Sequence, residues 1–337
     1  MCAVFGEWQF GLWPRCRFET VTPVALHDSL IRPLDAADDM VALTALIHRA
    51  YAPLGAAGMN FTAVDQTLEQ TRFRVEHGHC LVAEQHGRVV GTLTLDQAYD
   101  PNVHGWARAT PWFFRQDVMH LHQFAVDPAL QAQGIGAALL AAAQQAAHER
   151  GARALALDTA LPAAHLLAFY RRHGFAEVAQ VQWDAKHYRS TVMLKALSAP
   201  PPALDDAEHR CAIVRCFFAS FQARDWLAAR ALLRDDARMH WLASEEHFDD
   251  ADAIIRVNAI YPEGWRIHVH SVEATLAGGV ISVIEVFHGD QRFYASSQFT
   301  FTQGLIAFIQ EIWATREDPP AWRQASILGA YRRGSAH

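Results

Sequence analysis

Residues 131–136 read Gln131-Ala132-Gln133-Gly134-Ile135-Gly136, and they separate a predicted strand from a predicted helix. The strand runs from Met119 to Val126, and the helix from about Ala137 to Arg150. Glycines at such a junction let backbone N–H groups approach an anion, and a helix start adds unpaired donors and a positive dipole end. The stretch therefore predicts a diphosphate-binding loop, with an ordinary strand-to-helix turn as the alternative.

Strands and helices alternate on both sides of this loop. We expect further strands at residues 29–34, 80–84, 88–95, 154–158, 175–182 and 188–197. Helices are expected after Asp38 or Asp39, which can cap a helix, and from about Pro162 to Arg172. This order predicts an α/β domain with a mixed sheet.

Two motifs in this region resemble the GNAT superfamily of N-acetyltransferases. The first is the loop with Gln131, Gly134 and Gly136, and the second is the run from Tyr170 through Gly174-Phe175. The resemblance covers residues 29–197 and implies the mixed-sheet GNAT fold of acyl-CoA N-acyltransferases. It also implies that acetyl-CoA is the co-substrate and that an amine receives the acetyl group, without a metal.

The resemblance also assigns the cofactor residues. It implies that the CoA diphosphate is held by backbone donors near Gln131, Gln133, Gly134, Ile135 and Gly136. Strand residues Phe124, Ala125 and Val126 are expected to pair with the pantetheine arm at a bulge that the family usually has, with an N–H near Val126 facing the thioester oxygen. Ala163 stands where the family commonly has Asn or Ser, so one side-chain contact to the arm is expected to be missing.

Candidate catalytic residues follow from the same resemblance and from the chemistry. Tyr170 stands where the family often has the general acid that protonates the departing thiolate; a tyrosine packed on a helix face is the alternative. Freeing the lone pair of an alkylammonium costs roughly 4 kcal/mol at neutral pH, so a base or a desolvating pocket is needed. His120 and His122 alternate along one strand and can share a face, and Asp158 and Glu84 are further candidates. With nineteen histidines in the chain, a structural role is the simpler alternative for each.

The run Ser198-Ala199-Pro200-Pro201-Pro202-Ala203 marks the clearest domain boundary. Three successive prolines continue neither a helix nor a central strand, and they favour an extended spacer. We therefore predict an N-terminal extension at 1–27, a GNAT domain at 28–197, a linker at 198–204, a second domain at 205–320 and a C-terminal tail at 321–337.

After the linker, helical patterns come first and strands follow, at 265–275, 280–288, 292–302 and 305–314, which is typical of an α+β domain with an antiparallel meander. The aromatic helix at 211–221, Arg224-Asp225-Trp226 and the run from Leu232 to Ala237 resemble the nuclear transport factor 2-like superfamily, which includes SnoaL-like proteins and ketosteroid isomerases. The resemblance implies a curved-sheet cone, the cystatin-like fold, around an apolar cavity. It also implies a sheet that often pairs into a homodimer.

Glu285 alternates with Ile281, Val283 and Phe287 along one predicted strand. A carboxylate on an apolar face has a raised pKa, so Glu285 is the candidate pocket residue of the second domain; a structural glutamate is the alternative. The aromatic helix offers no tyrosine like the oxyanion donor of ketosteroid isomerases. A binding or dimerising role is therefore favoured over isomerase chemistry.

The composition limits the classes of partner that the protein is expected to bind. A net charge of −7 argues against nucleic acid or an anionic membrane, and no apolar run approaches the ~20 residues that span a bilayer. Five cysteines without a C-x-x-C spacing indicate reduced thiols in the cytoplasm and no metal site.

Three hypotheses remain at this level. The chain is an N-acetyltransferase with a second domain for ligand binding or dimerisation, a non-catalytic acyl-CoA-binding sensor, or a protein whose second domain carries isomerase- or cyclase-type chemistry.

Overall fold

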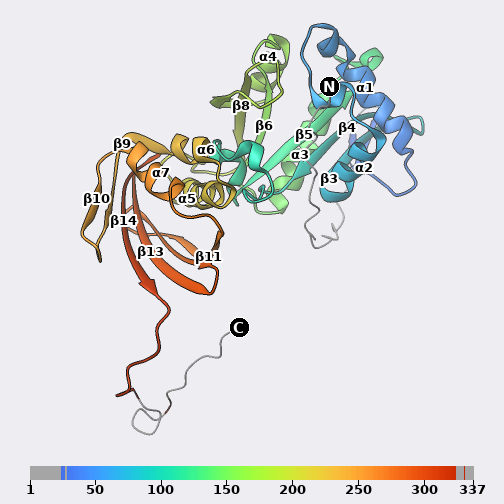
Figure 1. Ribbon diagram of the computed structural model, residues 1–337. Helices are drawn as coiled ribbons and strands as arrows, with labels where there is room; N and C mark the ends of the chain where they lie inside the picture. Colours follow the sequence, from blue (N-terminus) through green and yellow to red (C-terminus); the bar gives the residue numbers. More distant parts are fainter. Residues whose placement is uncertain (1–23, 27–28, 324–329, 331–337) are drawn as a thin grey trace, which may run out of the picture.

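The computed structural model describes residues 24–26, 29–323 and 330 (Figure 1). The predicted N-terminal extension, residues 1–27, lies outside this range except for residues 24–26, and most of the predicted tail at 321–337 lies outside it too. Within the range, the chain forms two sheets, each accompanied by helices. No helix among these residues is long and apolar enough to cross a membrane.

The first sheet has eight strands in the order β1-β2-β3-β4-β5-β6-β8-β7. The strands are β1 (Val24–Leu26), β2 (Ser29–Pro33), β3 (His79–Gln85), β4 (Arg88–Asp96), β5 (Val118–Val126), β6 (Ala154–Ala160), β7 (Ala176–Val181) and β8 (Ser190–Ala196). Only β5 and β6 run parallel; the other neighbours are antiparallel. The predicted mixed sheet is confirmed.

Helices cover both faces of this sheet: α1 (Met40–Ala56), α2 (Leu68–His77), α3 (Ile135–Glu149) and α4 (Ala164–Arg172). Alternation along β3 separates the two faces, because Leu81 and Ala83 pack with α3 whereas Cys80 and Val82 pack with α1. Helix α2 was not predicted, since it buries only Thr71 and lacks an apolar stripe. A capping box between Thr67 and Gln70 starts this helix instead.

The second sheet has six strands in the order β10-β9-β14-β13-β12-β11. The strands are β9 (Leu233–Trp241), β10 (Glu246–Phe248), β11 (Trp265–Ala274), β12 (Val280–His288), β13 (Gln291–Thr302) and β14 (Leu305–Thr315), and the helices are α5 (Ala207–Ala223), α6 (Trp226–Ala231) and α7 (Ala251–Ala259). The predicted antiparallel meander was incomplete, because β9 pairs with β14 in parallel and makes the sheet mixed. Charged residues 234–236 concealed β9, although Leu233, Ala237 and Met239 are buried in the core.

One apolar cluster joins the two halves of the chain. Trp112, Phe113 and Phe114 of the first half belong to the same buried cluster as Phe217 and Phe218 of α5. The halves therefore share a core across their boundary.

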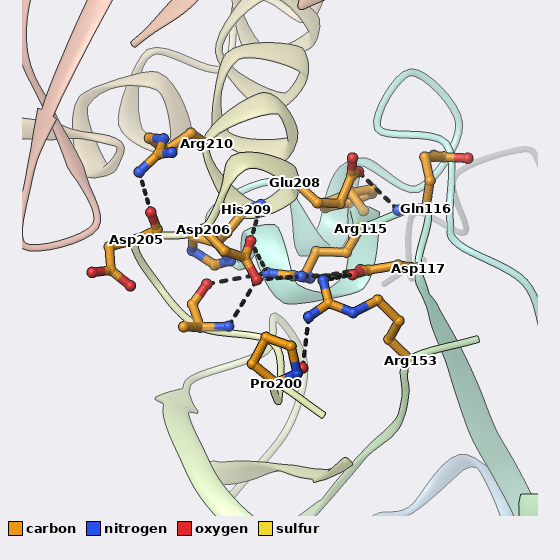
Figure 2. Close-up of polar contacts among 12 residues, drawn as sticks. Arg115, Gln116, Asp117, Arg153, Pro200, Asp205, Asp206, Glu208, His209 and Arg210 are labelled. Atoms are coloured by element: carbon orange, nitrogen blue, oxygen red, sulfur yellow. Dashed lines mark hydrogen bonds and ion pairs between the residues drawn. The ribbon is translucent and has the colours of Figure 1, made fainter. Parts of the chain in front are cut away.

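A buried guanidinium reinforces this junction (Figure 2). The Arg115 side chain is 0% exposed, and its Nη atoms donate to both Asp206 oxygens at 2.8 Å. Its Nε and one Nη also donate to Asp117, at 2.9 and 2.8 Å. Burial opposes the charge on Asp206, but the hydrogen bonds from Arg115 and from backbone N–H groups lower its pKa to about 2. Asp206 in turn caps α5, so the ion pair ties the first half to this helix.

The linker is held in place and is not a free spacer. Arg153 donates to the Pro200 carbonyl at 2.6 Å, and the Ala203 carbonyl accepts from Arg115 at 3.2 Å. Pro202 is buried. The polyproline run predicted the break in secondary structure but not these contacts.

Replacing Arg115 by leucine should therefore destabilise the protein by about 3–5 kcal/mol, because Asp206 loses its arginine partner and Asp117 keeps only Arg153. Chemical unfolding of the full chain measures this loss. The control is Arg230→Leu, since Arg230 also bridges two aspartates, Asp235 and Asp252, but both are 69% exposed or more. A control that loses as much stability as Arg115→Leu would contradict the role assigned to burial.

Candidate functional site

Strands β5 and β6 pair only where they begin. The three pairs are Val118 with Ala154, Met119 with Leu155 and His120 with Ala156. Beyond His120, β5 continues to Val126 without a ladder partner on that side among the described residues, while β6 continues along β8. A stretch of unpaired backbone therefore lies in the middle of the sheet, which is the arrangement that accepts an added extended segment.

A bulge interrupts β5 beside this opening. Thr92 of β4 lies opposite Ala125, and Thr94 lies opposite His122, so β5 has one residue more than β4 over this stretch. Gln123 adopts a φ of +50°, in the left-handed region that a non-glycine residue rarely enters. Its side-chain oxygen accepts from Thr94 Oγ1 at 3.3 Å. The bulge lies three residues before Val126 and redirects the backbone of the free edge.

The loop at residues 131–136 is exposed up to Gly134, and its backbone turns twice through positive φ. Ala132 has a φ of +60° and Gly134 a φ of +88°. Gly134 is the N-cap of α3, and no side chain of the described residues caps the helix there. Ile135 is 3% exposed and anchors the first turn in the core. The first N–H groups of α3 therefore have no side-chain acceptor at the N-cap, and the loop stays a candidate for anion binding.

The helix start lies close to β5 and α4. A Cβ added at Gly136 would lie 3.4 Å from Phe124 Cζ and 3.6 Å from Phe169 Cζ. The Tyr170 ring on α4 lies 6.4 Å from the Phe124 ring, centroid to centroid. Burial raises the pKa of Tyr170 well above its usual value, with smaller contributions from Tyr51 and Asp158, so its phenol is protonated at neutral pH. The structure thus brings the predicted loop, the strand residues and Tyr170 together.

His122 pairs with a carboxylate that the sequence analysis did not identify. His122 Nε2 lies 2.8 Å from Asp96 Oδ2, and the side chains are 20% and 26% exposed. Burial raises the pKa of Asp96, but the nearby His122 more than compensates and the net shift is downward, so the carboxylate is charged. A charged carboxylate orients an imidazole and stabilises its protonated form. Asp96 directly follows the predicted strand 88–95, and only the strand register shows that it reaches His122.

His120 has different surroundings. It is 1% exposed, and its ring stacks on Tyr99 at 4.7 Å and on Phe113 at 5.0 Å. Neither ring nitrogen makes a hydrogen bond of ordinary geometry within the described chain. Burial lowers its pKa to about 3, so this imidazole is neutral at neutral pH. Of the two predicted histidines, His122 has the geometry that suits a base.

The other two acidic candidates make structural contacts. Asp158 Oδ2 accepts from Trp183 Nε1 at 2.8 Å. Glu84 accepts from Arg32 Nε at 2.9 Å, and the same guanidinium also binds Asp38. Glu84 therefore belongs to an ion-pair network with β2, whereas Asp158 lies near the aromatic wall described next.

An aromatic wall surrounds the His120 ring. It is built by the connection between β4 and β5, at residues 97–117, together with Trp183. Tyr99 contacts Trp106 at 5.8 Å, and Trp106 contacts Trp183 edge-on at 4.9 Å. Phe113 also meets Trp183 at 5.7 Å. No role was predicted for this connection, since it holds only short 3-10 helices, at Gly105–Ala107 and Pro111–Phe114.

Glu285 does not lie on the interior face of the second sheet, and the prediction that it lines a pocket is wrong. The interior residues of β12 are Val280, Ser282, Ile284 and Val286, whereas Ile281 and Val283 are 42% and 36% exposed. Glu285 follows the alternation of these exposed residues. Its pKa is also lowered, not raised: burial raises it, but hydrogen bonds from Arg292, Tyr294 and His270 outweigh burial.

The interior carboxyl group of the second sheet belongs to Glu311. Its oxygens accept from Ser297 Oγ at 2.8 Å, from Trp241 Nε1 at 2.8 Å and from Trp313 Nε1 at 3.1 Å. All three donors are uncharged, and burial raises the pKa of Glu311. The side-chain alternation of the last strand was the only signal that could have identified it.

Among the described residues, no group of three or more His, Cys, Asp or Glu side chains is arranged to hold a metal ion. Cys80, Cys211 and Cys216 are buried and free. Cys2 and Cys16 lie outside the described range.

Residues 45–175 match the family model of the acetyltransferase (GNAT) family. A curated relative, the S-(2-succino)cysteine N-acetyltransferase of Bacillus subtilis (strain 168), is 32% identical over 104 residues, which are 30% of this chain and 56% of that protein. The chain thus spans about half the length of that relative. The family match and this relative support an acyltransferase.

Two solved structures are each similar to part of the chain. The ribosomal-protein-S18-alanine N-acetyltransferase of Escherichia coli is 20% identical, with 50% of this chain and 94% of that chain covered and a TM-score of 0.39. An NTF-2 like protein of unknown function from Burkholderia xenovorans LB400 is 16% identical, with 38% and 97% covered and a TM-score of 0.33.

The burial of His120 predicts a pH dependence of stability. Its pKa is about 3 in the folded chain against 6.5 ordinarily, so below pH 6.5 the unfolded chain binds a proton that the folded chain does not. Stability should therefore fall as the pH drops from 6.5 towards 3. His120→Phe keeps an aromatic ring in the stack and should reduce this slope by up to about 1.4 kcal/mol per pH unit. Urea unfolding between pH 4 and 7 measures the slope, and an unchanged slope would contradict the neutral buried state.

Proposed function

We propose that the first domain transfers an acetyl group from acetyl-CoA to a primary amine of a small molecule or peptide. One observation carries the proposal. The unpaired edge of β5 runs between a helix mouth with free N–H groups at one end and the His122–Asp96 pair at the other. A thioester laid along this edge has its diphosphate at the helix and its acyl carbon near a base.

In this placement the cofactor is held mainly by backbone. Amides at residues 131–136 bind the diphosphate, and the free edge at Phe124, Ala125 and Val126 pairs with the pantetheine arm as an added strand. Ala163 caps α4 without a side-chain hydrogen bond and is 1% exposed, so it adds no polar contact. The N–H groups redirected by the bulge at Gln123 supply the oxyanion donor, near Val126.

The reaction is a direct attack of the acceptor amine on the thioester carbon. His122 takes a proton from the ammonium, and the amine nitrogen then bonds to the thioester carbon. The C–S bond breaks as the tetrahedral intermediate collapses, and the phenol of Tyr170 donates its proton to the departing thiolate. The surplus proton on the acylated nitrogen then passes to the phenolate, which leaves a neutral amide and restores Tyr170. Asp96 keeps the imidazole oriented and stabilises its positive charge.

Gly134→Val should abolish acetyl-CoA binding, because the position has a φ of +88° and its Cβ would point into the open space that the diphosphate occupies. Gly151→Val is the matched control. Gly151 ends the same helix region with a φ of +78° and equally open surroundings, so the two variants share the backbone strain. Calorimetric titration of acetyl-CoA separates them. Normal affinity in Gly134→Val would contradict the loop assignment.

Two further variants separate the catalytic roles. His122→Gln should lower turnover about 100-fold or more, as expected for loss of a general base.

Tyr170→Phe should lower turnover at least tenfold, about 1.4 kcal/mol of barrier, because only the proton donor is lost. Acetyl-CoA affinity should change little in either variant, and thiol release with an amine panel is the measurement. Unchanged turnover removes the corresponding residue from the mechanism.

For the second domain we propose the nuclear transport factor 2-like, SnoaL-like fold, with a role in ligand binding or dimerisation. The outer face of its sheet exposes Ile281, Val283 and Ile312, the last at 52%, and these apolar side chains suit a homodimer contact. The mass of the full chain in solution tests this contact.

We also propose a cytoplasmic location, because Cys80, Cys211 and Cys216 are free thiols.

The buried Glu311 favours a second candidate function, in which the interior of this domain carries isomerase- or cyclase-type chemistry. A carboxyl group held only by neutral donors is suited to proton transfer. Turnover of a hydrophobic metabolite that is lost in Glu311→Gln but kept in His122→Gln would support this second function. The third possibility, an acyl-CoA sensor, requires binding of acetyl-CoA without thiol release.

A further inference from the structure

Asp158 lies across the opening of the first sheet from His122. Strands β5 and β6 make their last pair at His120 and Ala156, in parallel register, and His122 and Asp158 each follow by two positions. Since side chains alternate along a strand, both point to the face of the sheet on which His120 and Ala156 lie. Ala156 packs in the same cluster as Phe113, whose ring stacks on His120. The diverging strands therefore place His122 and Asp158 on opposite sides of one gap.

The exposure of the two strands shows that this gap is open. Asp158 is the only residue of β6 that is not buried, and its neighbours Leu157 and Thr159 are each 2% exposed. On β5, exposure begins at His122, after four buried residues. Exposure on both strands thus starts two residues beyond the last pair, as expected where a ligand enters between them.

The Asp158 carboxylate has one oxygen in use and one available. Oδ2 accepts from Trp183 Nε1 at 2.8 Å, whereas no donor of the described residues bonds to Oδ1, and none of them forms an ion pair with this carboxylate. The Lys186 ammonium is directed elsewhere, since its Nζ donates to the Asn60 carbonyl at 2.7 Å and to Thr62 Oγ1 at 3.3 Å. Asp158 therefore offers a cationic ligand an acceptor oxygen without a counter-charge of its own.

Aromatic side chains lie on the same face of β6. Ala160, two residues after Asp158, belongs to a buried cluster with Tyr188, and Tyr51 and Phe61 pack against that cluster. The Phe61 ring lies 5.6 Å from the Tyr51 ring and 5.2 Å from the Tyr188 ring, centroid to centroid. Burial raises the pKa of Tyr51 to about 12 and also raises that of Tyr188, and the Asp158 carboxylate adds to both shifts. Neutral aromatic rings near an unpaired carboxylate suit an ammonium on an apolar group.

We propose that Asp158 binds the ammonium group of the acceptor, and that the acceptor is a primary amine on an apolar group such as an aromatic ring. The inference rests on the proposed acetyl transfer, because His122 and the thioester define where the nitrogen lies. Asp158 accepts one N–H of the ammonium while His122 takes the proton of another, which holds the nitrogen between the two strands. The nitrogen is positive again once it has bonded to the thioester carbon, so the same carboxylate stabilises the tetrahedral intermediate.

The test compares phenethylamine with phenethyl alcohol, which has the same ring and chain but no charge. In calorimetric titrations of the full chain saturated with CoA, the amine should bind about tenfold more tightly than the alcohol, or better. Asp158→Asn should remove this preference, because the amide still accepts from Trp183 but carries no charge. In turnover with acetyl-CoA, the same variant should raise the KM for phenethylamine about tenfold or more, with acetyl-CoA affinity unchanged.

Trp183→Phe is the matched control, since it removes the same hydrogen bond and leaves the carboxylate in place. This control should keep the preference for the amine. Equal affinities in the wild type, a preference that survives in Asp158→Asn, or one that is also lost in Trp183→Phe would overturn the inference. Thiol release separates this failure from that of acetyl transfer. Turnover with a KM that Asp158→Asn leaves unchanged would refute the role of Asp158 alone, whereas a preference that Asp158→Asn removes, without any thiol release, would keep the ammonium site and refute the transfer.

Discussion

The Arg115 guanidinium, enclosed between two carboxylates, ties the first domain to the second. Asp117 stands one residue before β5, and Asp206 stands one residue before α5. The ion pair therefore sets the strand that carries His122 relative to α5, the first helix of the second domain. Because the arginine is completely buried, its two partners compensate a large desolvation cost, and the contact tolerates little displacement.

The transfer site arises from strands that diverge. If β5 and β6 stayed paired to their ends, the backbone groups at residues 121–126 would satisfy each other and leave no place for an extended ligand. Because the two strands diverge, these backbone groups stay available to a ligand. The bulge places Gln123 in the left-handed backbone region, which the surrounding packing must hold in place. The polar groups near this opening include the neutral phenol of Tyr170 and the His122 imidazole, which contacts the charged carboxylate of Asp96.

Short stretches of sequence predicted the elements that neighbouring residues determine by themselves. The glycine loop and the alternating strands follow from spacing along the chain, and Tyr170 was singled out by the resemblance to the GNAT family. The structure has the loop between β5 and α3 and Tyr170 on α4. Asp96 and the aromatic wall could not be predicted, because they depend on register between strands and on a connection without periodicity. Glu285 was assigned to the wrong face, since alternation alone does not tell which face of a strand meets the core. Glu311 obeys the same alternation on the opposite side.

The shared apolar cluster has a consequence for how such a chain can change over evolutionary time. Aromatic side chains at 112–114 are buried by α5, so deleting or exchanging the second domain would leave them in water. Recombination between fused genes succeeds most easily where few contacts cross the join, and this join is crossed by both a core and a buried charge. A replacement partner would have to reproduce the acidic cap of α5 and its apolar face together, which makes this pairing of domains a single inherited unit.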